Sequence, residues 1–111
     1  MAKGDFLGEF ELCVLLAVSH LGDNAYGLAI RQTIARRSGR ETAIGAVYAT
    51  LGRLQSKALV TFTLSAPEPV AGGRARKCFT VTASGQRALQ HSTSMLTRML
   101  AGWAPKPRRS S

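Results

Sequence analysis

The spacing of apolar residues predicts a helix near the start of the chain, over residues 6–21. One face carries apolar side chains at helical intervals, at Phe10, Val14, Ala17, Val18 and Leu21. The opposite side is apolar as well, with Leu12, Leu15 and Leu16. A helix that is apolar on both sides has to be buried on both. We therefore expect a second cover for it, either another helix of the chain or a second copy.

Two further helices are expected over residues 24–37 and 43–57, with Asn24 and Thr42 as N-caps. The helix over 43–57, the third of the chain, has a narrow apolar stripe at Ile44, Val47, Leu51 and Leu54. Its other side carries mostly small residues, namely Gly45, Ala46, Ala49, Gly52, Arg53 and Ser56. Glycine costs helix stability, so two glycines on an exposed face favour close approach to a partner over an indifferent surface.

A β-hairpin and a terminal helix follow. Val60–Leu64 alternates apolar residues with threonine, as a half-buried strand does. Ser65–Gly73 contains two prolines and two glycines and is a loop, and Arg76–Val81 is a second strand. Thr82 is expected to cap a helix over 83–103, in which apolar residues recur every seven positions. Such a stripe packs either on a partner helix or on the chain's own core.

This order of elements predicts an α+β fold that is mainly helical: a winged helix-turn-helix of three helices and a hairpin wing, plus a C-terminal dimerisation helix. With 111 residues, one core is expected. We divide the chain into a DNA-binding domain (1–81), the dimerisation helix (82–103) and a disordered basic tail (104–111). The predicted dimer interface comprises Leu12, Leu16, Leu89, Leu96, Met99, Leu100 and Trp103.

The charge of the chain is strongly basic and unevenly distributed. Fifteen Lys and Arg residues stand against six Asp and Glu, a formal net charge of +9. Residues 1–30 hold one base and four acids, whereas residues 31–111 hold fourteen bases and two acids. This concentration indicates a polyanionic partner, either nucleic acid or an anionic membrane surface, with an inert solvated surface as the alternative.

The third helix and the wing carry the residues that we expect to contact DNA. In a winged helix the third helix enters the major groove, and the hairpin reaches the backbone or the minor groove. Arg53 points outward and can meet a phosphate or a guanine, while Tyr48 can donate its hydroxyl to a phosphate. Thr42 and the backbone amides at the start of the third helix can hold another phosphate. The predicted DNA-binding residues are Arg40, Thr42, Gly45, Ala46, Tyr48, Ala49, Arg53, Arg74, Arg76 and Lys77.

Other kinds of chemistry find little support in the sequence. Cys13 and Cys78 each lie in an apolar run without a Cys/His cluster, so neither a zinc site nor a disulfide framework is expected. His20 and His91 are far apart, and no paired carboxylates, nucleophile motif or phosphate loop accompanies them. Leu12–Val18 is too short to span a bilayer. We expect a cytoplasmic protein that is not an enzyme and needs no cofactor or metal.

Several segments occur in a familiar order and spacing: Gly8–Glu11, Ala25–Ile30, Val47–Leu54, Lys57–Val60 and Arg76–Gly85. Across them, over roughly residues 7–103, the chain resembles PadR-type transcriptional regulators. Val47–Leu54 is similar to the family's Leu-Tyr-Pro-x-Leu-x-Arg-Leu signature. Arg76–Gly85 is similar to its Arg-Lys-Tyr-Tyr-x-Leu-Thr-x-x-Gly segment. The single short C-terminal helix resembles the smaller subgroup of the family.

The resemblance implies a dimer, held by the first and last helices, that binds a pseudo-palindromic operator. It implies that Tyr48, its neighbours on the third helix and the basic wing residues meet DNA. Three positions depart from the family pattern: Ala49 replaces a proline, Cys78 an aromatic residue and Ala58 a common glycine. Alanine at 49 suits a helix, whereas Cys78 reduces the volume available for packing.

The sequence thus predicts a sequence-specific DNA-binding transcriptional regulator, a dimeric repressor. The alternative is a winged-helix module for nonspecific DNA binding or for protein contacts. A small hydrophobic effector is a further expectation, with Met95, Met99 and Trp103 beside the first helix as the candidate lining. A filled dimer interface is the alternative to such a cavity.

Overall fold

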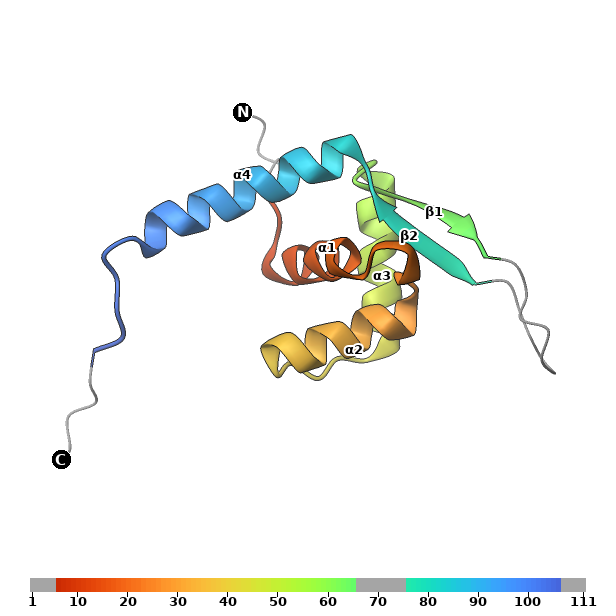
Figure 1. Ribbon diagram of the computed structural model, residues 1–111, viewed down its shortest axis with the longest axis horizontal. Coiled ribbons are helices and arrows are strands. Elements are labelled where there is room, and N and C mark those ends of the chain that lie inside the picture. Colours follow the sequence, from red (N-terminus) through yellow and green to blue (C-terminus); the bar gives the residue numbers. More distant parts are fainter. Residues whose placement is uncertain (1–5, 66–75, 107–111) are drawn as a thin grey trace.

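The computed structural model describes residues 6–65 and 76–106, and within them four α-helices and one hairpin follow in the predicted order (Figure 1). The helices are α1 (Glu9–Leu21), α2 (Gly27–Ser38), α3 (Ile44–Ser56) and α4 (Ala83–Leu100). The strands β1 (Val60–Leu64) and β2 (Lys77–Val81) pair antiparallel, with Val60 opposite Val81 and Leu64 opposite Lys77. This arrangement confirms the predicted winged helix-turn-helix.

The core lies where α1, α2 and α3 meet the base of the hairpin. Val14, Val47 and Leu54 are fully buried there, and Phe79 of β2 closes the core at 3% exposure. Leu15, expected on the second side of α1, is also fully buried. The second side of α1 is therefore narrower than the sequence indicates, and Leu12 and Leu16 remain half-buried along it.

Helix α1 begins three residues later than expected because the preceding segment packs on α4. The Phe6 ring lies 4.4 Å from the His91 ring between centroids, and the Leu7 N–H donates to Ser92 Oγ at 3.3 Å. Gly8 then caps α1, and its N–H donates to Glu11 Oε1 at 3.0 Å. This hydrogen bond to the Glu11 side chain satisfies the Gly8 N–H, which has no intrahelical acceptor.

Helix α2 begins at Gly27 and not after Asn24, so the predicted Asn24 cap is wrong. Asn24 belongs to a short 3-10 turn over Gly22–Asn24. Ala25 is fully buried and its carbonyl accepts the Phe79 N–H of β2 at 2.8 Å, so the helix does not begin there. The N-cap is Tyr26, which has an extended backbone. A contact with a strand distant in sequence thus delays the helix.

Helix α4 starts directly on the hairpin. The Thr82 side chain accepts the Gly85 N–H at 3.0 Å, which confirms the predicted N-cap. A Cβ at Gly85 would collide with the Leu59 carbonyl oxygen, so glycine is needed for α4 to approach the end of α3 this closely. The helix ends at Leu100 and not at Trp103, since Gly102 adopts a left-handed φ of 79°.

Only the first part of α4 packs on the domain. It crosses α1, and its second half extends beyond the other helices toward the C-terminus (Figure 1). Of the predicted basic tail, residues 107–111 lie outside the described residues.

Candidate nucleic-acid interface

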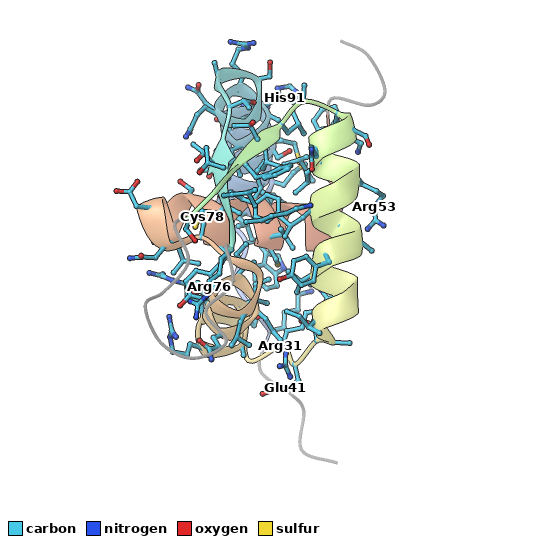
Figure 2. The ribbon with its side chains drawn as sticks, turned by 90° about the vertical axis from the view of Figure 1, so that its right-hand side faces the viewer. Arg31, Glu41, Arg53, Arg76, Cys78 and His91 are labelled. Carbon is cyan, nitrogen blue, oxygen red and sulfur yellow. The ribbon has the colours of Figure 1, made fainter. Side chains whose placement is uncertain are left out.

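The outward face of α3 is exposed to solvent and consists mostly of small residues, as predicted. Val47, Thr50, Leu51 and Leu54 are buried, which turns the opposite face of the helix away from the core. That face exposes Gly45, Ala46, Tyr48, Ala49, Gly52, Arg53 and Ser56. Figure 2 shows Arg53 on this outer side of α3. A Cβ at Gly45 or Gly52 would meet nothing within 4 Å, so neither glycine is required by packing within the chain.

Tyr48 connects α3 to the start of α2. Its ring lies so close to Gly27 that a Cβ there would collide with the ring and the hydroxyl. Tyr48 is still 49% exposed, so its hydroxyl sits at the surface beside the first turn of α2. The first amides of a helix have no intrahelical acceptor and carry partial positive charge. The hydroxyl and these amides together form a surface that suits a phosphate group.

Two basic side chains of the wing, Arg76 and Lys77, lie over aromatic rings. The Arg76 guanidinium lies 4.6 Å from the centre of the Tyr26 ring, and Lys77 Nζ lies 4.5 Å from the centre of the Phe62 ring. These are cation–π contacts, which hold a charged group over a ring while leaving it accessible. Figure 2 shows Arg76 and Arg53 on different sides of the domain. Arg74, also predicted to bind DNA, lies outside the described residues.

Thr42 does not cap α3, because Ala43 occupies the N-cap position and no side chain caps the helix. The Thr42 hydroxyl oxygen is buried without a hydrogen-bond partner, so it does not reach a surface phosphate. Its carbonyl accepts Arg31 Nε at 2.8 Å. Arg31, which the sequence analysis missed, therefore holds the turn between α2 and α3. Nothing in the sequence around Arg31 predicts this hydrogen bond.

Two ion pairs connect the first turn of α1 to the residues on either side of α3. Arg40 NH1 lies 2.8 Å from Glu9 Oε1, and its guanidinium lies 4.9 Å from the centre of the Phe10 ring. Lys57 Nζ lies 2.8 Å from Glu11 Oε2 at the other end. Arg40, predicted to bind DNA, is thus already paired, although it remains exposed.

The environment of Glu11 favours its charged form. Burial raises the pKa of this carboxyl, but the hydrogen bonds from Lys57 and the Gly8 N–H, with the charges of Lys57 and Arg53, outweigh it. The pKa of Glu11 is therefore below its ordinary value of 4.5. At neutral pH the carboxylate holds the end of α3 through Lys57.

The second half of α4, together with Trp103 just beyond its end, presents an apolar surface. Leu96, Met99, Leu100 and Trp103 are 40%, 72%, 55% and 64% exposed. Leu89, predicted to lie at the same interface, is only 7% exposed and belongs to the chain's own core. It lies on the half of α4 that crosses α1, so this side chain is not available to a partner.

A small pocket of about 150 Å³ lies between α1 and α2. Its apolar lining comes from Leu16, Ala17 and Ile34, and polar groups come from Cys13, His20, Thr33, Arg37 and Ser38. The candidate effector lining of Met95, Met99 and Trp103 is not part of it. Within residues 6–65 and 76–106, no group of three metal-ligating side chains occurs. No helix in this part of the chain is long and apolar enough to cross a membrane.

The model of the transcriptional regulator PadR-like family matches residues 15–91 of the chain. A PadR-like transcription factor from Bacteroides fragilis has a similar structure, with a TM-score of 0.67 and 22% identity over 83% of this chain and 84% of that one. A PadR family regulator from Eggerthella lenta is 26% identical, with a TM-score of 0.64 and coverage of 80% and 75%. One from Clostridium difficile is also 26% identical, with a TM-score of 0.62 and coverage of 81% and 94%. None of the curated proteins compared with the chain matches it.

The family match runs from the middle of α1 to the first half of α4 and so includes α3 and both strands. It covers more than half of the 111 residues. The chain therefore belongs to the PadR-like family of transcriptional regulators and has the fold of a DNA-binding regulator.

Proposed function

We propose that the protein is a dimeric repressor that binds a pseudo-palindromic operator in double-stranded DNA. The observation that carries the proposal is the outward face of α3, which is exposed and built of small residues in a family of transcriptional regulators. A helix with such a face can lie deep in the major groove, because no bulky side chain holds it away. Gly45, Ala46, Ala49 and Gly52 form the part that approaches the bases.

Contacts with the DNA backbone would come from the groups around α3. Tyr48 and the first amides of α2 suit one phosphate, and the amides that begin α3 suit another, in place of the Thr42 side chain. Arg53, Arg76 and Lys77 supply positive charge at exposed positions. Arg74 is proposed to add to this charge. Arg40 would bind a phosphate by exchanging its bond with Glu9.

Dimerisation would bury the apolar surface of α4. Met99 and Trp103 are mostly exposed, and a water-facing cluster of this kind is typical of an interaction surface. Leu12 and Leu16 of α1 are half-buried and would complete the interface. A two-fold axis would then place two α3 helices on two half-sites.

The division of the chain follows from this assembly: a DNA-binding unit over 1–81, a dimerisation helix over 82–103 and a basic tail over 104–111. Repression would occur by occluding the promoter, which needs no activation surface. The protein would act in the cytoplasm, on the DNA that it controls.

A small hydrophobic effector would act through the pocket between α1 and α2. A cavity of about 150 Å³ can hold a molecule the size of benzene. Leu16 belongs both to this pocket and to the proposed interface, so an occupant could change how two copies pack. A screen of small aromatic compounds for altered operator affinity tests this part; compounds that bind without changing that affinity would contradict it.

In vitro selection from a random duplex library, with the full chain at physiological salt, tests the central proposal. We expect enrichment of a sequence with two inverted half-sites, bound at least about a hundredfold more tightly than a scrambled duplex. Binding without enrichment would make the protein a nonspecific DNA binder. Failure to retain any duplex would indicate a winged helix that contacts proteins.

A further inference from the structure

The polar side chains on the outer side of α3 are directed toward the protein's own atoms. Arg53 NH2 donates to the buried Thr50 hydroxyl at 2.9 Å. Ser56 Oγ donates to the Gly52 carbonyl at 3.0 Å. The Tyr48 hydroxyl lies against the first residue of α2. These three polar groups therefore already have contacts within the protein.

The surface that α3 can present to a groove is therefore mainly apolar. Ile44, in the first turn, was expected on the apolar stripe with Val47 and Leu51, but it lies at the edge of that stripe and is 38% exposed. Ala46 and Ala49 are exposed as well. Gly45 and Gly52 lie along the same face, with open space beyond them. Gln55, in the last turn, is the exposed side chain amide of this helix.

In the major groove, an apolar surface of this kind is complementary to one feature of the base pairs, the methyl group of thymine. Guanine, adenine and cytosine present hydrogen-bond donors and acceptors, which Arg, Asn, Gln or a carboxylate recognise. Thymine also presents a 5-methyl group, which apolar side chains contact. A close approach is needed for this contact, and the two glycines permit it.

We propose that α3 recognises its operator chiefly through thymine methyl groups, which pack against Ile44, Ala46 and Ala49. The inference rests on the proposed function, in which α3 enters the major groove. It assigns Ile44 as a specificity-determining residue and limits Arg53 to a supporting phosphate contact.

The test replaces thymine by uracil in the operator obtained by selection. Uracil keeps every hydrogen-bonding group and the pairing of thymine but lacks the methyl group. Each thymine of a half-site is replaced in turn, and the affinity of the full wild-type chain is measured by titration. We expect about a fourfold loss at each contacted position, from the usual value of one buried methyl group. Replacement outside the half-sites should change nothing.

A second arm links the effect to one side chain. In Ile44→Ala, the uracil penalty should disappear at one thymine of each half-site and persist at the others. Gln55→Ala is the matched control, because Gln55 is exposed on the same helix but would read bases by hydrogen bonds. It should leave the sequence preference unchanged.

The outcomes separate the inference from the function on which it rests. Unchanged affinity for every uracil duplex would overturn methyl recognition while leaving specific binding intact. Loss of sequence preference in Gln55→Ala or Arg53→Ala would likewise replace it by hydrogen-bond reading. If the selection enriches no sequence, the proposed function itself fails. The uracil arm uses the unaltered chain, so it stands even if Ile44→Ala does not fold.

Discussion

Ala58 adopts a backbone conformation that alanine disfavours. Its φ is 61°, and it is the single non-glycine residue in the described part of the chain with a positive φ. It directly follows Lys57, the C-cap of α3, and the Leu59 N–H donates to the Leu54 carbonyl at 2.9 Å across it. Glycine is usual at this point of a helix end because a Cβ is strained there. The departure from the family pattern at position 58 therefore has a cost in stability.

We expect Ala58→Gly to raise the free energy of unfolding by about 1 kcal/mol, since the left-handed strain is removed. Urea unfolding of the two proteins measures the change. Gly39→Ala is the matched control: Gly39 has a φ of 73° and open space around it, so an added Cβ should only introduce strain and lower stability. A more stable Gly39→Ala would show that backbone strain is not what these positions share.

Glu11 makes stability depend on pH. Its pKa is lowered by folding, so its contribution is fully present above the ordinary value of 4.5. That contribution is lost as the pH falls through the lowered pKa of the folded state. Glu11→Gln should therefore be less stable than the wild type at neutral pH, and the difference should shrink in acid.

Unfolding of both proteins by urea between neutral pH and pH about 3 measures this difference. Glu9→Gln serves as the control, because the Glu9 side chain is 86% exposed and such surface pairs contribute little. A constant difference between wild type and Glu11→Gln across the pH range would show that Lys57 does not stabilise the charged form.

At the scale of the element, α3 has a composition that opposes its own stability. Gly45 and Gly52 are exposed helix residues with no neighbour that excludes a methyl group. Gly52→Ala should therefore stabilise the protein by about 1 kcal/mol. If the helix lies deep in the groove, the same methyl group should weaken operator binding. Urea unfolding and DNA titration of one variant would show the two effects in opposite directions; an unchanged affinity would move the contact away from Gly52.

Most elements could be predicted because their signals are local. Alternation with threonine identified β1, and the burial of Val47, Leu51 and Leu54 follows the helical period that also exposed the small face of α3. The preference of threonine for the N-cap position, which is also a local signal, correctly predicted the Thr82 cap. These features need no knowledge of other segments.

The features that were missed depend on contacts between distant segments. The start of α2 depends on the bond between Ala25 and Phe79, and the burial of Leu89 depends on where α4 crosses α1. In the candidate site, the roles of Gly27 and Arg31 follow from the packing of Tyr48 and from the Thr42 carbonyl. Spacing along one helix carries no information about such contacts.

At the scale of the whole molecule, the exposed half of α4 determines the proposed assembly. Leu96→Arg would place a charge in the apolar surface that a second copy should cover, and we expect monomers by light scattering. Operator affinity should fall with the dimer, because two half-sites are no longer bound together. Gln90→Arg adds the same charge at an exposed position nearer the core and is the control. A dimeric Leu96→Arg protein would place the interface elsewhere.

The direct connection of β2 to α4 has a consequence for the DNA. Thr82 is the single residue between them, so α4 is held to the winged helix without a flexible linker. In a dimer joined through α4, the separation of the two recognition helices would be a fixed length. Operator half-sites would then have to share one angular phase on the duplex, at about one helical turn of 34–36 Å or a multiple of it. Half a turn of inserted DNA would put the second half-site on the far side, where this protein cannot reach it by bending.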